Sequence, residues 1–157
     1  MPSDSEPDSV LVGWVQPTVA AQDPVVRRLR SVPGVGPVTA VGFVAALDAV
    51  DRFASARRVA GYLGLTPTER SSGEQQHRGR ISKTGNPRAR MLLVEAGWRL
   101  LRARQAAAAP LRAWGERLAA RRGRAIAAVA LARRLARILY ALWRDGSEYR
   151  PGVPRAA

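Results

Sequence analysis

The sequence predicts an all-α fold, in which a helix-hairpin-helix is followed by a basic loop and a bundle of longer helices. One observation is that a capping residue followed by proline, which is typical of a helix start, occurs at Asp23-Pro24 and again at Asn86-Pro87. A second is the helical spacing of apolar side chains near the C-terminus, at Leu131, Leu135, Ile138 and Leu142.

Three short helices are expected in the first half of the chain, over about residues 24–31, 37–47 and 56–63. Asp23 caps the first, Ser55 caps the third, and Gly64 ends the third. Residues 33–37, with the sequence PGVGP, must form a tight turn. This turn makes the first two helices a helix-hairpin-helix.

Residues 65–86 are rich in Thr, Ser, Gly, Gln and Arg and show no helical period, which predicts a long loop or a short irregular hairpin. Loops of this length inside compact domains are often functional. Three longer helices follow, over about residues 87–107, 110–122 and 124–144. We therefore expect one helical domain over 24–151, after a disordered acidic leader over 1–23 and before a tail over 152–157.

The charge of the chain is strongly positive. Its 157 residues include 26 Lys and Arg against 12 Asp and Glu, a formal net charge of +14. Residues 1–23 hold four acids and no base, so residues 24–157 carry a net charge of +18. Such an excess implies a polyanionic partner, of which nucleic acid is the commonest and an anionic membrane surface the main rival.

The composition also excludes several classes of protein. Cysteine is absent, which rules out a disulfide scaffold, a thiol nucleophile and thiolate zinc sites. His77 is the single histidine, so a His-rich metal site is excluded and no metal site is predicted. No apolar run approaches the roughly 20 residues that a membrane-spanning helix needs. We expect a cytoplasmic protein. A membrane-surface protein is disfavoured, because the arginines lie in loops as well as on helices and no helix shows a clean apolar-basic split.

The turn at residues 32–36 has the hydrophobic-Gly-hydrophobic-Gly form of a helix-hairpin-helix. Gly34 and Gly36 would let backbone amides approach a phosphate, and the helix that begins at Pro37 would point its positive dipole end at the same group. The alternative is a glycine turn between two core helices. The positive charge of the domain favours the binding interpretation, since contact with backbone phosphate needs no base recognition.

The segment 70–90 carries six positive charges against one acid, which favours contact with nucleic acid. The basic residues are Arg70, Arg78, Arg80, Lys83, Arg88 and Arg90. Ser71, Ser72 and Gly73 lie among them, and by itself such a triplet is most often a turn. Yet a serine surrounded by guanidinium groups is what attack on a phosphodiester by a side-chain oxygen requires.

The sequence allows two functional interpretations for each of several other residues. His77 is either a proton acceptor for Ser72 or, more commonly for such a position, an exposed histidine near phosphate. Four aromatic residues are either base-stacking platforms or core anchors, namely Trp98, Trp114, Trp143 and Tyr140. A further basic group is either a solvated face or a track for a nucleic-acid backbone, namely Arg102, Arg104, Arg117, Arg121, Arg122 and Arg124.

Four sequence blocks follow one another along the chain, at residues 29–37 (LRSVPGVGP), 53–72 (FASARRVAGYLGLTPTERSS), 78–86 (RGRISKTGN) and 130–151 (ALARRLARILYALWRDGSEYRP). In this order and spacing they resemble the C-terminal transposase domain of the insertion-sequence 110/116/902 family. The resemblance covers about residues 25–151. It implies a DNA recombinase that joins strands through a covalent serine-DNA intermediate and is guided by a structured RNA.

The resemblance places the family's nucleophile at Ser72, with Ser71 as the second candidate. It also implies an N-terminal RNase H-like domain whose Asp/Glu cluster binds Mg²⁺. The acidic leader of 23 residues is too short for such a domain. We therefore expect this chain to carry the serine half of a composite site, to bind no Mg²⁺ alone and to be inactive in isolation.

The expected partner is DNA, with a guide RNA, a second copy of the chain and an RNase H-like domain as further candidates. The rival function is that of a non-catalytic nucleic-acid-binding module, either a truncated remnant or an accessory protein. Both functions account for the charge and for the helix-hairpin-helix.

Overall fold

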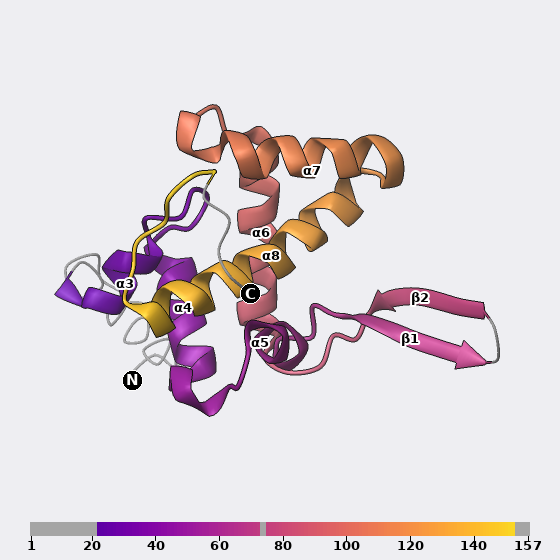
Figure 1. The fold of residues 1–157 in the computed structure, drawn as a ribbon, viewed down its shortest axis with the longest axis horizontal. Helices are drawn as coiled ribbons and strands as arrows, with labels where there is room; N and C mark the ends of the chain where they lie inside the picture. The colour runs from indigo at the N-terminus through magenta and orange to yellow at the C-terminus, as the bar shows by residue number, and fades with distance from the viewer. Residues whose placement is uncertain (1–21, 73–74, 153–157) are drawn as a thin grey trace, which may run out of the picture.

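The computed structural model of the chain describes residues 22–72 and 75–152. For residues 69–72 and 75–79 it describes the backbone and not the side chains. In this part of the chain, helices dominate and a single two-stranded sheet projects from them (Figure 1). The predicted all-α class is confirmed for the body of the molecule. The predicted leader over 1–23 and tail over 152–157 lie almost entirely outside the described residues.

The helices begin where the capping signals predict. Asp23 accepts hydrogen bonds from the first turn of α3, Ser55 from that of α5, and Asn86 from that of α6. The α-helices are α3 (Pro24–Leu29), α4 (Pro37–Leu47), α5 (Ala56–Tyr62), α6 (Pro87–Arg102), α7 (Ala109–Arg122) and α8 (Arg124–Asp145). Two short 3₁₀ helices are η1 (Val50–Arg52) and η2 (Ala106–Ala108).

The helix predicted over 87–107 ends earlier, because Ala103 takes an extended conformation after Arg102. The Ala103 carbonyl accepts a hydrogen bond from the guanidinium of Arg112, on the next long helix. A tertiary contact thus holds the chain where it turns back, and no glycine or proline signals this end in the sequence.

The core is built around α6 and α8, which cross near the middle of the molecule (Figure 1). The predicted apolar stripe of α8 is confirmed, since Leu131, Leu135 and Leu142 are fully buried. Gly97 of α6 faces the backbone of α8 so closely that an added Cβ would overlap the carbonyl oxygen of Ala128. Helix α7 packs against both, and α5 packs against α8.

Helices α3 and α4 and the turn between them form one wall of the body. Their buried side chains, among them Leu29, Val32 and Phe43, join the same core. The backbone N–H of Tyr149 donates a hydrogen bond of 2.9 Å to the Ser31 hydroxyl, which fixes the segment after α8 to this wall. Burial raises the pKa of the Tyr149 phenol above its ordinary value.

The region predicted as a loop is a β-hairpin that projects from the helical body (Figure 1). Strand β1 (Pro67–Ser72) pairs antiparallel with β2 (Gln75–Ile81), and the register shifts between Pro67 and Glu69. Of the two alternatives left by the sequence, the hairpin is therefore correct. Both strands are mostly polar, so the apolar alternation that marks a half-buried strand is missing.

Replacing Gly97 with alanine should destabilise the protein by about 2–3 kcal/mol, because the new methyl group would force α6 and α8 apart. Gly61 of α5 is the matched control, since a Cβ there meets no atom within 4 Å. Gly61→Ala should stabilise the fold by about 0.5–1 kcal/mol through helix propensity alone. Urea denaturation measures both; equal effects of the two substitutions would contradict the close contact.

Candidate nucleic-acid interface

The two glycines of the turn before α4 have different structural roles. Gly34 has a φ of +82°, and a Cβ there would lie 3.1 Å from the carbonyl oxygen of Ala96 and from Cγ of Leu100, both on α6. Gly36 has a φ of −92°, and its nearest neighbour would be the guanidinium of Arg99 at 3.9 Å. The fold therefore requires glycine at position 34 but not at position 36.

Helix α4 begins at this turn without a side-chain cap among the described residues. Pro37 carries no N–H, and the next backbone N–H groups of the first turn have no carbonyl partner within the helix. Val38 on the same turn is exposed. Pro37 is half-buried and Thr39 is buried, so the end of the helix is only partly accessible, with the polarity that suits a phosphate.

The basic residues predicted for the segment 70–90 lie along the hairpin and just beyond it. Arg80, Lys83 and Arg88 are exposed. Arg70 and Arg78 lie on the paired strands, and their side chains are outside the described residues. Exposed cations therefore continue from β2 into the first turn of α6, as contact with a polyanion requires.

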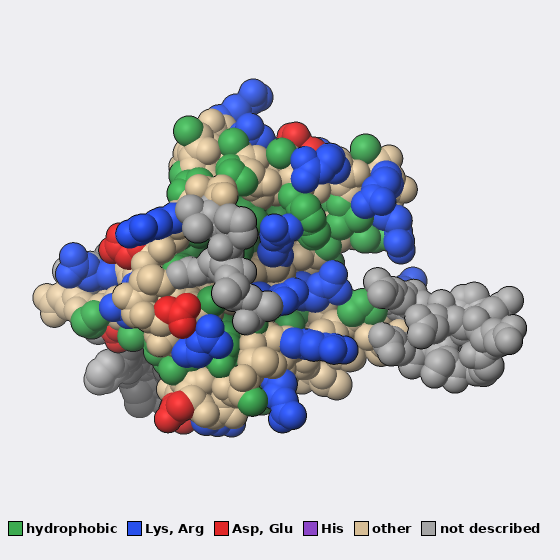
Figure 2. All heavy atoms as spheres, in the orientation of Figure 1, with side chains coloured by type: hydrophobic (Ala, Val, Ile, Leu, Met, Phe, Trp, Pro, Cys, Tyr) green, Lys and Arg blue, Asp and Glu red, His purple; other side chains and the backbone are tan. Residues whose placement is uncertain are grey.

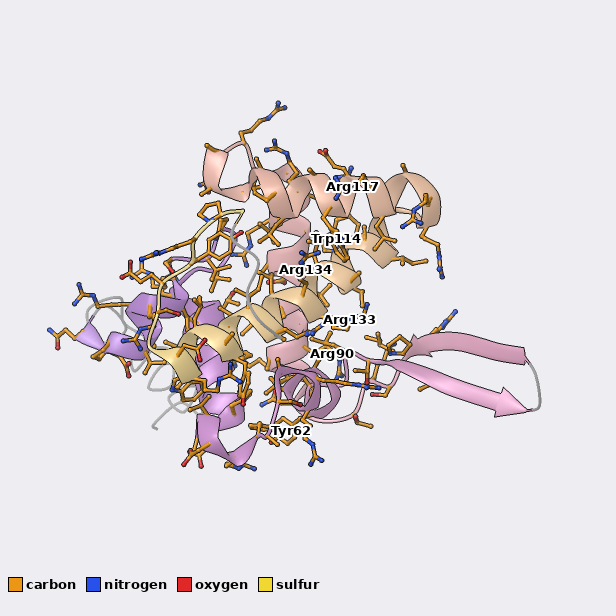
Figure 3. All side chains as sticks on the ribbon, viewed as in Figure 1. Tyr62, Arg90, Trp114, Arg117, Arg133 and Arg134 are labelled. Carbon is orange, nitrogen blue, oxygen red and sulfur yellow. The ribbon has the colours of Figure 1, made fainter. Side chains whose placement is uncertain are left out.

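Arg90, the last of these predicted contacts, has protein partners. Its guanidinium donates hydrogen bonds to the carbonyl oxygens of Leu63 at 3.3 Å and Thr84 at 3.0 Å. Arg90 is half-buried and lies where the hairpin leaves the helical body (Figure 3). A guanidinium has five N–H donors, so Arg90 has donors for a phosphate in addition to these two hydrogen bonds. The contact of Arg90 with phosphate stays a prediction.

Glycines make the base of the hairpin compact. A Cβ on Gly64 would overlap the Thr84 carbonyl oxygen, and a Cβ on Gly85 would overlap that of Tyr62. Between these two contacts, the Lys83 N–H donates a hydrogen bond of 3.1 Å to the Gly64 carbonyl oxygen. The segment that ends α5 and the segment that leads into α6 are thus held against each other, which fixes the origin of the hairpin.

Ser72 is the last residue of β1 and pairs with Gln75, while Ser71 pairs with Gln76. His77 pairs with Arg70, so the backbone register does not place His77 opposite Ser72. The side chains of all these residues lie outside the described residues, and the roles predicted for Ser72, Ser71 and His77 stay predictions. The hairpin carries Ser72 away from the helical body (Figure 1).

The aromatic residues divide between core and surface. Tyr140 is buried, and its hydroxyl donates a hydrogen bond of 2.8 Å to the Phe53 carbonyl oxygen. Trp143 makes an edge contact with Phe43 at 6.4 Å between ring centroids. Trp114 lies under the guanidinium of Arg134, 4.7 Å from its ring centroid (Figure 3). These three rings have protein partners, as the core-anchor interpretation expects.

Two further surfaces are basic. Exposed arginines cover α7 and the turn into α8 (Figure 2), namely Arg117, Arg121, Arg122 and Arg124. Glu95, Trp98, Arg99 and Arg102 line an open groove on α6. Arg99 was not predicted as a contact, although its spacing from Glu95, Trp98 and Arg102 places all four on one helical face.

Among residues 22–72 and 75–152, no helix is long and apolar enough to cross a membrane. The same residues contain no group of three or more His, Cys, Asp and Glu side chains that could hold a metal ion.

These features define a basic, mainly helical domain with a partly buried glycine turn and a projecting hairpin. Residues 26–112 match the model of the transposase IS116/IS110/IS902 family. The chain belongs to this family, as its sequence blocks indicate.

Two relatives that this chain resembles are themselves named as transposases. A probable family 20 transposase of Pseudomonas aeruginosa is 37% identical over 130 residues, which cover 83% of this chain and 38% of the relative. The transposase for insertion sequence element IS1111A of Coxiella burnetii is 35% identical over 127 residues, covering 81% of this chain and 35% of the relative. The chain thus spans well under half the length of these relatives.

Substituting the turn glycines separates their roles. Gly34→Ala should destabilise the protein by about 1–3 kcal/mol, because alanine is strained at a φ of +82° and crowds α6. Gly36→Ala should change stability by less than about 0.5 kcal/mol, because its backbone is ordinary and the site is open. Thermal unfolding checks both. A stable Gly34→Ala variant would contradict the packing of the turn on α6.

Proposed function

We propose that this chain is the DNA-binding part of an insertion-sequence transposase that acts in DNA transposition, and that it supplies the serine half of a composite strand-cleaving site. The observation that carries the proposal is the position of Ser72 at the end of β1, on a basic hairpin that projects from the body within the segment matched to the family. A serine on such an arm can approach a duplex that lies beside the helical body.

The proposed step is attack by the Ser72 hydroxyl oxygen on a DNA phosphorus atom. A serine Oγ–P bond forms, the bond between phosphorus and one sugar oxygen breaks, and the departing sugar oxygen takes up a proton. The serine proton passes to a general base. Arginines of the hairpin would stabilise the negative charge that grows on the pentacoordinate phosphorus.

The described residues of this chain do not fit a resident Mg²⁺ ion, because no three acidic or histidine side chains come together there. We derive no step through the metal. Acidic ligands would have to come from an RNase H-like domain, as the family resemblance implies, and a guide RNA would select the DNA sites. The composite site would assemble on DNA in the cytoplasm.

The second candidate is a nucleic-acid-binding module without catalysis. It is favoured by the glycine turn and the exposed arginines of α7 and α8, which would hold DNA without any serine. Both candidates predict binding, and only the first predicts a covalent adduct.

Binding of this chain to duplex DNA should weaken steeply with salt. If about five phosphates are neutralised, the slope of log K against log salt concentration should have a magnitude of at least about 4. Fluorescence anisotropy with a labelled duplex between 50 and about 300 mM salt measures it. A slope near zero would contradict an interface built on arginine and phosphate.

The purified chain alone should form no detectable covalent adduct with DNA. Addition of an RNase H-like partner, Mg²⁺ and the cognate guide RNA should produce the adduct with the natural sequence and with Ser71→Ala, but not with Ser72→Ala. Denaturing gels with end-labelled DNA detect it. If the adduct still forms with Ser72→Ala and does not form with Ser71→Ala, the nucleophile is Ser71 and not Ser72. An adduct formed by the chain alone without metal would refute the composite site.

A further inference from the structure

The groove on α6 contains Trp98 and Arg102, for which the sequence left two interpretations each, together with Glu95 and Arg99, for which it predicted no role. Its lining residues follow the spacing i, i+3, i+4 and i+7, so they form one continuous strip of the helix surface. They are Glu95, Trp98, Arg99 and Arg102. The strip combines two guanidinium groups, one half-buried indole and one carboxylate.

Arg99 connects this groove with the glycine turn. Its guanidinium lies 3.5 Å from the carbonyl oxygen of Gly34, at the outer limit of a hydrogen bond, and beside the open position at Gly36. Its nearest approach to the Glu95 carboxylate is 4.0 Å, and both side chains are about half exposed, at 45% and 56%. Neither contact holds Arg99 strongly, since exposed pairs of this kind contribute little.

The chemistry of the strip suits a polynucleotide backbone. Guanidinium groups bind phosphate in two places at once, and a half-buried indole offers an apolar face to a sugar or a base. The uncapped helix α4 begins directly after Gly36, where an added Cβ would lie 3.9 Å from the guanidinium of Arg99. The carboxylate of Glu95 is the one acidic group among the lining residues and would compete with phosphate for Arg99.

We propose that this groove binds the sugar-phosphate backbone of a DNA strand, with Arg99 and Arg102 on the phosphates, Trp98 against a sugar or base, and Glu95 opposing the contact. The proposal rests on the proposed function only in that the chain binds DNA. It adds a second contact surface, on the helical body and separate from the hairpin that carries Ser72. The net charge of +14 favours this strand over an acidic protein segment of lower charge density.

The sharpest test is removal of the opposing carboxylate. Glu95→Gln should strengthen binding to a labelled duplex about threefold, because it removes a competitor for Arg99 and a repulsion of phosphate. Glu116→Gln is the matched control, since Glu116 is equally exposed, at 55%, and forms the corresponding i,i+4 pair with Arg112 at 3.8 Å. The control removes the same charge from α7. The change in log Kd that it causes should be less than half of the change caused by Glu95→Gln.

The complementary test removes Arg99. Arg99→Gln should weaken binding and reduce the magnitude of the salt slope by about one, as loss of one phosphate contact requires. Arg144→Gln is the matched control, because Arg144 has the same side-chain exposure of 45% and an acidic neighbour in Asp145. The control should leave the slope unchanged. In the Arg99→Gln background, Glu95→Gln should have lost most of its effect.

The outcomes separate the two proposals. If the natural chain does not bind DNA at any salt concentration, the proposed function fails. If it binds but Arg99→Gln and Arg144→Gln have equal effects, or Glu95→Gln matches Glu116→Gln, only the net charge matters and the groove proposal is overturned. Binding of a poly-glutamate peptide that depends on Arg99, with DNA binding unaffected by Arg99→Gln, would assign the groove to an acidic protein segment and also overturn it.

Discussion

The structure depends on the close approach of α6 and α8 at Gly97, where no side chain separates the two backbones. This contact fixes α6, and α6 in turn positions the hairpin, the glycine turn and the groove. Its first turn carries Arg90, which ties down the base of the hairpin. Its middle packs against Gly34, and its outer face carries the arginine groove. One buried contact therefore sets the geometry of several exposed sites.

The charged side chains of the ion pairs lie at the surface of this helical framework. Ion pairs join Arg99 to Glu95, Arg112 to Glu116 and Arg144 to Asp145, and each joins residues close in sequence at the surface. Such pairs contribute little stability and leave most of the arginine charge uncompensated, since the chain has 26 basic and 12 acidic residues. A domain of this charge gains most from an external polyanion, and DNA is the polyanion that the proposed function supplies.

Local signals in the sequence predicted much of the fold and little of its long-range contacts. The caps at Asp23, Ser55 and Asn86 and the leucine stripe of α8 are confirmed because each depends on neighbours within one or two turns. The hairpin was predicted only as one of two alternatives, since its polar strands lack an apolar face. The partners of Arg90 include Leu63, 27 residues away. No local pattern encodes such a contact. Arg99 shares a helical face with Glu95, Trp98 and Arg102, which is a local pattern that was not used, whereas its approach to the Gly34 carbonyl oxygen, 65 residues away, has no local signal.

We propose that DNA is held by the glycine turn, the outer face of α6 and the hairpin together. Amide hydrogen exchange of the chain with and without duplex DNA tests this arrangement most directly, because it reports each segment in one experiment. We expect DNA to slow exchange at residues 34–39, at residues 95–102 of α6 and along the paired strands of the hairpin, with no change near the C-terminal end of α8 at residues 139–145. Slowed exchange confined to residues 117–127, around the turn between α7 and α8, would contradict the account and place the DNA on the other basic surface.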